Sequence, residues 1–406
     1  MAACLSGCTT PGSSAAVPDA PPIATQSCVA PATWVVPGRG VVPAPTLMGE
    51  IEARRVVLLG EYHDDVMHHA WQLGIISGLA ARRVNLVIGL EMLPRSAQPA
   101  LDRWIKGEIT EKQFARESQW WEYWKFDPAL YMPILRFAQL HQIPVYGLNV
   151  ERSLVDAVRA RGWENIPVQE RGGLTDPARP SADYLETLAL SYSMHGAHSG
   201  ASHGAKPDVE RLLNDPGFRR FVQGQQLWDR GIAQSIAELA QAHPDAVMVG
   251  LMGSGHLMDR AGVPHQLADL GIQESAVLLP WDESFDCSLL TSSFADAVFG
   301  MRSMTVAASE EGPKLGVQIE SAHQGVRVAK VVAGSVAEGA GLHDDDVLLS
   351  LACRNVHNVE DVVTTVRAML PGAWLPVTVQ RGAERLDLVA KFPVLPEESA
   401  PTAHSP

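Results

Sequence analysis

The chain of 406 residues is long enough for two or three domains with a sizeable hydrophobic core. Apolar residues make up 46% of it and charged residues 19%, which favours a mostly globular protein over a disordered one. The formal net charge is −14, and no block of Lys and Arg forms a phosphate-neutralising face. We therefore expect no nucleic-acid partner, and no attraction to anionic membranes by charge alone.

The first 40 residues predict a lipid anchor followed by a flexible tether. Leu5-Ser6-Gly7-Cys8 resembles the bacterial lipobox, in which a cysteine after small residues becomes acylated. A run rich in Thr, Pro, Gly, Ser and Ala follows. A signal peptide needs a basic start and an apolar stretch of roughly 7–15 residues, and too little sequence precedes this box. The segment 1–40 is either the remnant of a lipoprotein signal or an ordinary disordered end. We favour the first, with lipidation at Cys8 on the periplasmic side of a bacterial membrane.

The remaining cysteines leave two alternatives open. No pair has C-x-x-C spacing, which disfavours a structural zinc site. Cys28 just precedes the first expected domain and Cys287 just follows its last expected strand, so a disulfide can join them. Otherwise Cys28, Cys287 and Cys353 are three buried thiols, and this is the alternative that we favour.

Apolar runs alternate with amphipathic segments between residues 41 and 285. Strands are expected at 54–60, 85–92, 143–149, 245–253 and 275–280, and helices at 66–83, 94–104, 128–142, 151–162, 208–242 and 263–271. Such alternation predicts an α/β fold, with a mostly parallel sheet that has helices on both faces. The Gly-, Ser- and His-rich stretch 191–208 predicts a mobile loop.

The last part of the chain changes character after an irregular linker at 286–311. A small strand-rich unit follows, with Lys314-Leu315-Gly316-Val317 near its start and a helix after Asn358. Residues 312–394 resemble a PDZ domain. The resemblance implies that backbone N–H groups of Leu315, Gly316 and Val317 bind the carboxyl terminus of a peptide or protein partner. The tail 395–406 is expected to be disordered.

Polar side chains follow four of the expected strands at the point where each strand ends. They are Glu61 and His63, then Glu91, then Asn149, Glu151 and Arg152, and finally Gly253, Ser254 and His256. The carboxyl ends of parallel strands meet at one edge of an open sheet, where such folds place their ligands. These side chains are therefore expected to form one site.

Two of these strand ends share the pattern G-x-x-H, at 60–63 and 253–256. The glycine lets the chain turn sharply, so that the imidazole points back over the sheet edge. Two imidazoles and a carboxylate can hold a transition metal, one His or Tyr can ligate haem iron, and an imidazole near a carboxylate can act as a general base. The alternative is two turn glycines followed by helix-capping residues. Folding is expected to survive substitution of either histidine, because rim residues contribute little to the core.

The segment 119–126, QWWEYWKF, gathers Trp120, Trp121, Tyr123 and Trp124 within a short stretch. Porphyrin is a broad, flat, apolar ligand that aromatic faces suit, so Trp120, Tyr123 and Trp124 are candidate haem contacts. Tyr62, Tyr123 and Tyr131 are candidate phenolate ligands of ferric iron. The alternative is an aromatic helix that only packs on the sheet. His68 and His69 face either the same edge or solvent.

Five stretches resemble ChaN-type haem-binding uptake lipoproteins, within the superfamily that includes Tiki proteases and erythromycin esterases. The stretches are LLGEYHDDVMHH, VIGLEMLPRSAQPALDRWIKGEIT, VYGLNVERSLVDAVRARG, QLWDRGIAQSI and VMVGLMGSGHL. The resemblance implies a haem or iron role at the cell envelope. In the Tiki branch, the positions that match His63, Glu91 and His256 are metal ligands or catalytic residues.

Three functions follow from these observations. The favoured one is a haem-binding envelope lipoprotein in haem or iron uptake, whose PDZ unit binds a partner. Its haem contacts are expected to be Glu61, Tyr62, His63, Glu91, Trp120, Tyr123, Trp124 and His256. The second is a metal-dependent hydrolase, with a divalent ion and catalysis at His63, Glu91 and His256. The third is a non-catalytic PDZ scaffold. Haem, a peptide carboxyl terminus, a membrane reached through the lipid anchor and a second copy of the chain are the expected partners, and enzymatic activity is left open.

Overall fold

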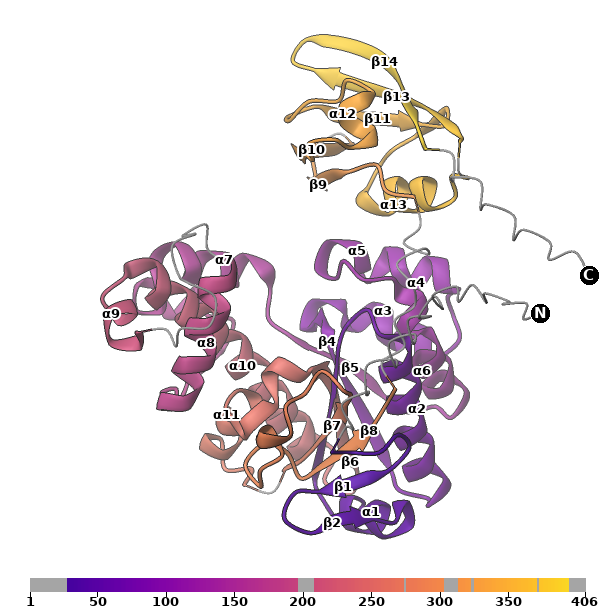
Figure 1. Ribbon diagram of the computed structural model, residues 1–406. Helices are drawn as coiled ribbons and strands as arrows, with labels where there is room; N and C mark the ends of the chain where they lie inside the picture. The colour runs from indigo at the N-terminus through magenta and orange to yellow at the C-terminus, as the bar shows by residue number, and fades with distance from the viewer. Residues whose placement is uncertain are drawn as a thin grey trace, which may run out of the picture.

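The computed structural model describes residues 28–195, 208–273, 275–302, 313–322, 325–370 and 372–393. It shows an α/β domain followed by a smaller, strand-rich domain (Figure 1). The predicted lipobox with Cys8, the tail 395–406 and most of the predicted loop 191–208 lie outside the described residues. Within the described residues, none of the helices combines the length and the hydropathy that crossing a membrane requires.

The first domain is built on an eight-stranded sheet with the order β2-β1-β8-β7-β3-β6-β4-β5. The six strands from β3 to β8 are parallel to one another, whereas β1 pairs antiparallel with both β8 and β2. Their bounds are Trp34–Val36, Gly40–Val42, Val56–Glu61, Leu86–Pro94, Val145–Asn149, Val247–Gly253, Ser275–Trp281 and Ala297–Gly300, from β1 to β8. The predicted α/β class with a mostly parallel sheet is confirmed.

The predicted limits of this domain, 41–285, are too narrow. β1 lies within the predicted tether, 1–40, and β8 lies within the predicted linker, 286–311. The two strands pair with each other in register at Trp34 and Phe299. They have only three and four residues, too few for an apolar run to be recognised as a strand without its neighbours.

Residues of the central strand alternate between two hydrophobic cores. Val57 and Leu59 of β3 belong to one core, and Val56 and Leu58 belong to the other. This is the period of two expected of a strand that is covered on both faces. The same alternation places the end of β3, at Glu61, on the face of Val57 and Leu59.

Helices cover both faces of the sheet (Figure 1). Those numbered α1 to α6 span Ala44–Ile51, Val66–Ala81, Gln98–Ile105, Glu111–Glu117, Trp120–Tyr123 and Pro128–Leu140, and they supply much of the core on the Val57 face. Those numbered α7 to α11 span Arg152–Arg161, Ala182–His195, Val209–Leu213, Pro216–Ala242 and Val263–Asp269, and α10 and α11 cover the Val56 face. The predicted helix 208–242 is two helices, because Asp215 caps α10 and Pro216 fits only its first turn.

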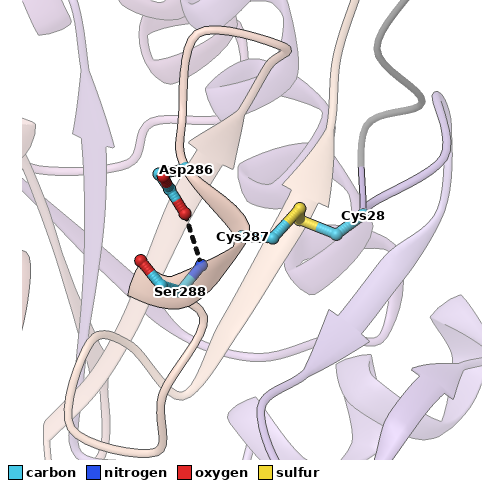
Figure 2. Close-up of a disulfide and its surroundings, with 4 residues drawn as sticks. All are labelled: Cys28, Asp286, Cys287 and Ser288. Atoms are coloured by element: carbon cyan, nitrogen blue, oxygen red, sulfur yellow. Dashed lines mark hydrogen bonds between the residues drawn. A yellow bond between two sulfur atoms is a disulfide. The ribbon is translucent and has the colours of Figure 1, made fainter.

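A disulfide joins Cys28 to Cys287 across 259 positions of the chain, with 5.8 Å between the two Cα atoms (Figure 2). The short helical turn Cys287–Leu289 begins there, where Asp286 accepts a hydrogen bond of 2.8 Å from the backbone N–H of Ser288. The favoured alternative of three buried thiols is therefore wrong, and Cys353 is exposed. A disulfide that closes so long a loop typically contributes about 2–4 kcal/mol by constraining the unfolded chain.

The second domain is an antiparallel sheet with the order β14-β13-β11-β10-β9, closed by two helices. Strands β9 to β14 span Val317–Ser321, Val326–Val331, Val347–Leu351, Arg354–Asn355, Trp374–Arg381 and Glu384–Lys391, and helices α12 and α13 span Val336–Gly339 and Val359–Arg367. The domain touches the first one through α5. The Arg367 guanidinium lies 4.9 Å from the Trp121 ring and pairs with Asp127, and the Ser321 hydroxyl bonds Glu122.

Candidate functional site

The first G-x-x-H turn places His63 directly over a buried carboxylate. Glu61 is 1% exposed, and its Oε1 lies 2.9 Å from Nδ1 of His63. Gly60 has no room for a side chain, since a Cβ there would lie 2.5 Å from Leu279 and 2.7 Å from the hydroxyl of Ser254. The strand can therefore approach the second G-x-x-H turn closely only because position 60 is glycine.

Three further side chains hold Glu61 from the helices that cover this face. Oε2 of Glu61 lies 3.3 Å from Nδ1 of His69 and accepts a bond of 3.0 Å from Gln72, both on α2. The hydroxyl of Tyr131 on α6 donates a bond of 2.7 Å to Oε1. Burial alone would raise the pKa of Glu61, but its bonds to His63, His69 and Tyr131 outweigh that effect and lower it to about 2. The carboxylate is therefore ionised at neutral pH.

The second G-x-x-H turn builds a matching pair on the opposite face. Oε2 of Glu91 accepts a bond of 2.7 Å from the backbone N–H of Gly253, and Oε1 lies 3.3 Å from Nε2 of His256. A Cβ at Gly253 would lie 2.8 Å from Cε1 of His63. This glycine therefore lets the two histidine turns lie side by side.

His256 is held between two buried carboxylates. Its Nδ1 lies 2.6 Å from Oδ1 of Asp229 on α10, whose Oδ2 accepts a bond of 2.6 Å from the hydroxyl of Tyr184. Burial lowers the pKa of His256, but Glu91 and Asp229 raise it well above its usual value, so both ring nitrogens carry protons. The expectation that folding tolerates loss of His256 is not supported, because its removal would leave two buried carboxylates without their counter-charge.

The two turns open into one cavity of about 490 Å³. It is lined by His63, Glu91, Pro94, Tyr123, Trp124, Lys125, Phe126, Asn149, Val150, Arg152, Val155, Asp156, Arg159, Trp228 and His256. The imidazole of His63 meets the ring of Trp124 edge-on at 4.6 Å, and Trp228 lies 5.4 Å from His256. All four predicted strand ends contribute to this cavity, through His63, Glu91, Asn149, Arg152 and His256, whereas Glu61, Glu151, Gly253 and Ser254 do not line it.

Several residues predicted as haem contacts do not line this cavity. Trp120 is fully buried and donates its Nε1–H to the carbonyl of Phe126, so it packs in the core. Tyr62 is 39% exposed and lies beside His68 and Phe285. Neither side chain reaches the cavity, because neighbouring positions along the chain point in different directions.

The phenolate candidates are disfavoured by their surroundings. Burial, with the carboxylate of Glu61 as second cause, raises the pKa of Tyr131 far above its usual value, and this hydroxyl is already used as a donor. Burial also raises the pKa of Tyr123. His68 and His69 are both buried, and His69 lies at the site only as a support for Glu61.

The predicted metal ligands His63, Glu91 and His256 do meet at the cavity. Within the part of the chain that the structure describes, however, no group of three or more His, Cys, Asp or Glu side chains has an arrangement suited to a metal ion. Glu91 and His256 are engaged with each other, and Asp229 holds the second nitrogen of His256.

Sequence reasoning missed the residues that come from the helices. Asp229, Gln72 and Trp228 lie inside amphipathic helices, where a polar or aromatic residue gives no sign of facing a site. The only signal for Asp229 was its position in the stretch QLWDRGIAQSI, which carries part of the family resemblance. The cavity residues Arg159 and Lys125 likewise lay within noted stretches, VYGLNVERSLVDAVRARG and QWWEYWKF, but nothing there distinguished them as site residues.

The stability of the domain should depend on acid pH through Glu61. Its folded-state pKa is about 2, below the unfolded value of about 4.5, so its contribution is present above pH 4.5 and is lost as the pH falls through 2. Glu61→Gln should lower the free energy of unfolding at pH 7 by about 3 kcal/mol and flatten its fall between these pH values. Urea unfolding followed by circular dichroism at several pH values measures both effects.

The matched control is Glu170→Gln, which removes an exposed carboxylate paired with Arg161. It should leave the shape of the pH profile unchanged. Parallel profiles for wild type and Glu61→Gln would show that Glu61 is not held as an anion in the folded state.

Comparison with known proteins agrees with this architecture. A model of the family described as haem-binding uptake, Tiki superfamily, ChaN matches residues 47–267, and a PDZ-domain model matches residues 313–391. No curated protein matches the chain significantly. The first match covers more than half of the chain.

One solved structure shares the fold of the first domain. A structure described as cofacial haem binding to ChaN of Campylobacter jejuni has a TM-score of 0.50 and 18% identity, and it covers 66% of this chain and 95% of the other. The PDZ domain of HtrA3 with a phage-derived ligand matches 19% of this chain and 83% of the other at 17% identity and a TM-score of 0.18. A serine endoprotease from Yersinia pestis matches 20% of this chain and 29% of the other at 23% identity and a TM-score of 0.18. The chain thus belongs to the ChaN haem-binding uptake family of the Tiki superfamily, with a PDZ domain after the family domain.

Proposed function

We propose that the cavity at the sheet edge binds haem and that His63 is the ligand of its iron. The observation that carries this proposal is the state of the His63 ring. Nδ1 is held by Glu61, while Nε2 has no hydrogen-bond partner among the described residues, and the side chain is 29% exposed at the cavity. A histidine whose second nitrogen is bound to a carboxylate is oriented and made more basic as a metal ligand.

The cavity also fits the shape and polarity of a porphyrin. Its volume of about 490 Å³ lies in the usual range for cofactor sites. Trp124, Phe126, Val155 and Trp228 provide apolar and aromatic walls. When bound, haem would supply a coordinated iron and a chromophore; the residues of this chain would hold the imidazole in place and exclude water from it.

Haem titration tests this function directly. Purified protein titrated with haemin should develop a shifted Soret band, and His63→Ala should weaken the binding by at least tenfold or change the position of the band, because the axial ligand is lost. His256→Ala is a poorer test, since loss of its counter-charge also destabilises the domain.

Asp64→Asn is the matched control for His63→Ala. Asp64 is exposed, adjoins His63 in the chain and does not line the cavity, so the substitution should leave the haemin spectrum unchanged. A His63→Ala spectrum and affinity equal to those of wild type would refute the assignment of this ligand. Absence of any spectral change with wild type would refute haem binding in this cavity.

A metal-dependent hydrolase is the second candidate, because His63, Glu91 and His256 share one cavity. It requires the contact between Glu91 and His256 to open, so that both face the same ion. This function would be favoured by peptide cleavage that a chelator inhibits and that the His63→Ala substitution abolishes. The haem proposal is better supported by the arrangement in the described structure.

The PDZ domain is proposed to bind the carboxyl terminus of a partner. β9 is an edge strand, so it can pair with an added peptide strand. The carbonyls of Leu315 and Gly316 accept bonds of 2.8 and 2.9 Å from Ala337 and Val332. In a trans peptide the next N–H points the opposite way, which directs the N–H groups of Gly316 and Val317 away from these partners.

Gly316 is the position that tests this carboxylate loop. Its φ is +81°, and a Cβ would lie 2.2 Å from that of Ser335. Gly316→Ala should therefore distort the loop and weaken the best peptide of a carboxyl-terminal library by tenfold or more, whereas Lys314→Ala should only weaken it slightly. Fluorescence anisotropy with full-length protein measures both affinities.

Gly382→Ala is the control for that substitution. Gly382 also has a positive φ, but a Cβ would have no neighbour within 4 Å. Amidation of the peptide should abolish its binding to wild type. Equal affinity for the free and the amidated peptide would exclude carboxylate recognition by this loop.

We also propose that the protein acts in haem or iron uptake at the bacterial cell envelope, anchored through Cys8. The Cys28–Cys287 disulfide supports this location, because disulfides persist mainly in oxidising compartments. Expressed behind a complete signal peptide, the protein should take up labelled palmitate. Cys8→Ser should lose the label and Cys4→Ser should keep it; label retained by Cys8→Ser would refute the anchor. Homodimer formation stays a prediction.

A further inference from the structure

Three cations line the cavity, in which Glu91 is the buried carboxylate and Asp156 an exposed one. Lys125 follows α5, and Arg152 and Arg159 lie in the first and last turns of α7. All three side chains are exposed. The two arginines are seven positions apart, which places them on one face of α7, roughly 10 Å apart along its axis.

Two of these cations have no ion-pair partner, and the third has only a weak one. Among the described residues, neither Lys125 nor Arg159 has a carboxylate within ion-pair distance. Arg152 lies 4.0 Å from Asp156, at the limit of an ion pair, and otherwise donates a long bond of 3.3 Å to the carbonyl of Glu122. Three cations that are available to an anionic ligand therefore line one cavity.

Two nearby arginines that do not line this cavity form ion pairs instead. Arg161, two positions after Arg159 in the same helical turn, pairs with Glu170 at 3.1 Å. Arg95 pairs with Glu238 at 2.9 Å. Arg159 instead lies over Gly224 of α10, where a Cβ would approach its Cγ and Nε to 3.1 Å. Gly224 thus leaves room for the Arg159 side chain beside the cavity.

The lining of the cavity ranges from buried to exposed polar groups. Glu91 and His256 are buried, whereas the three cations and Asp156 are exposed, and Trp124, Phe126 and Trp228 add aromatic surface. A flat apolar ligand that bears carboxylates along one edge matches this lining. Arg is suited to such carboxylates, because its planar guanidinium can donate two parallel charge-assisted bonds.

We propose that Arg152 and Arg159, with Lys125, form a carboxylate-binding subsite that selects porphyrins by their propionate groups. The subsite rests on the haem function proposed above and adds its specificity. It orients the ligand with its iron towards His63 and its carboxylates towards solvent. Asp156 pairs loosely with Arg152 when no ligand carboxylate is present.

Comparison of haemin with its dimethyl ester tests the subsite in full-length protein. Esterification removes both carboxylate charges and keeps the iron and the macrocycle. Wild type should bind haemin at least tenfold more tightly than the ester, and increasing salt should weaken only the binding of haemin. Arg152→Ala and Arg159→Ala should each weaken haemin about tenfold and leave the affinity for the ester unchanged.

Arg161→Ala is the matched control, because it removes an arginine from the same turn of α7 that does not line this cavity. It should bind haemin as wild type does. Equal wild-type affinities for haemin and the ester would overturn the subsite while haem binding stands, and they require no variant to fold. If neither compound shifts its Soret band with wild type, the haem function itself fails.

Discussion

The site depends on one buried anion, the carboxylate of Glu61 at the end of the central strand. A buried carboxylate is costly unless hydrogen bonds or charges compensate it, and here His63, His69, Tyr131 and Gln72 all do so. These partners come from the strand end and from two helices. The anion therefore fixes the position of α2 and α6 relative to the sheet edge, and it sets the orientation of the His63 imidazole at the cavity.

The second carboxylate extends the same principle to the other face of the sheet. Glu61 lies on the side of α2 and α6, whereas Glu91 faces His256 and, through it, Asp229 of α10. Gly253 is the only spacer between the two arrangements, and its lack of a side chain lets His63 reach over the edge. Three buried carboxylates, each with its own partners, thus hold the two histidines that line a single cavity.

The sequence predicted the strand-end residues of this site, but it did not predict the helix residues that contact them. The five apolar runs became strands, and the strand ends with His63, Glu91 and His256 gathered at one cavity, because sheet topology determines where strand ends meet. What the sequence could not show is which residue of a helix faces the sheet edge. Asp229 and Arg159 are ordinary helical positions until the packing of α10 and α7 brings them to the cavity.

The directions of the side chains in the aromatic segment 119–126 could not be predicted from the sequence either. Its rings looked equivalent in the sequence, yet α5 has only one turn and sends each ring in its own direction. Trp120 fills the core and Trp121 meets Arg367 of the PDZ domain, while Trp124 contacts His63 and donates to the hydroxyl of Tyr131.

One short helix is therefore both a wall of the cavity and the surface on which the second domain rests. Glu122 of α5 bonds Ser321 at the end of β9, the strand at which a peptide would pair, and Tyr123 lines the cavity from the next position. Because Gln119, the residue that precedes α5, has a φ of +54°, the chain enters this helix through a conformation that few side chains adopt readily. Packing on both sides is what holds this turn, so the cavity wall and the peptide-binding edge share one structural support.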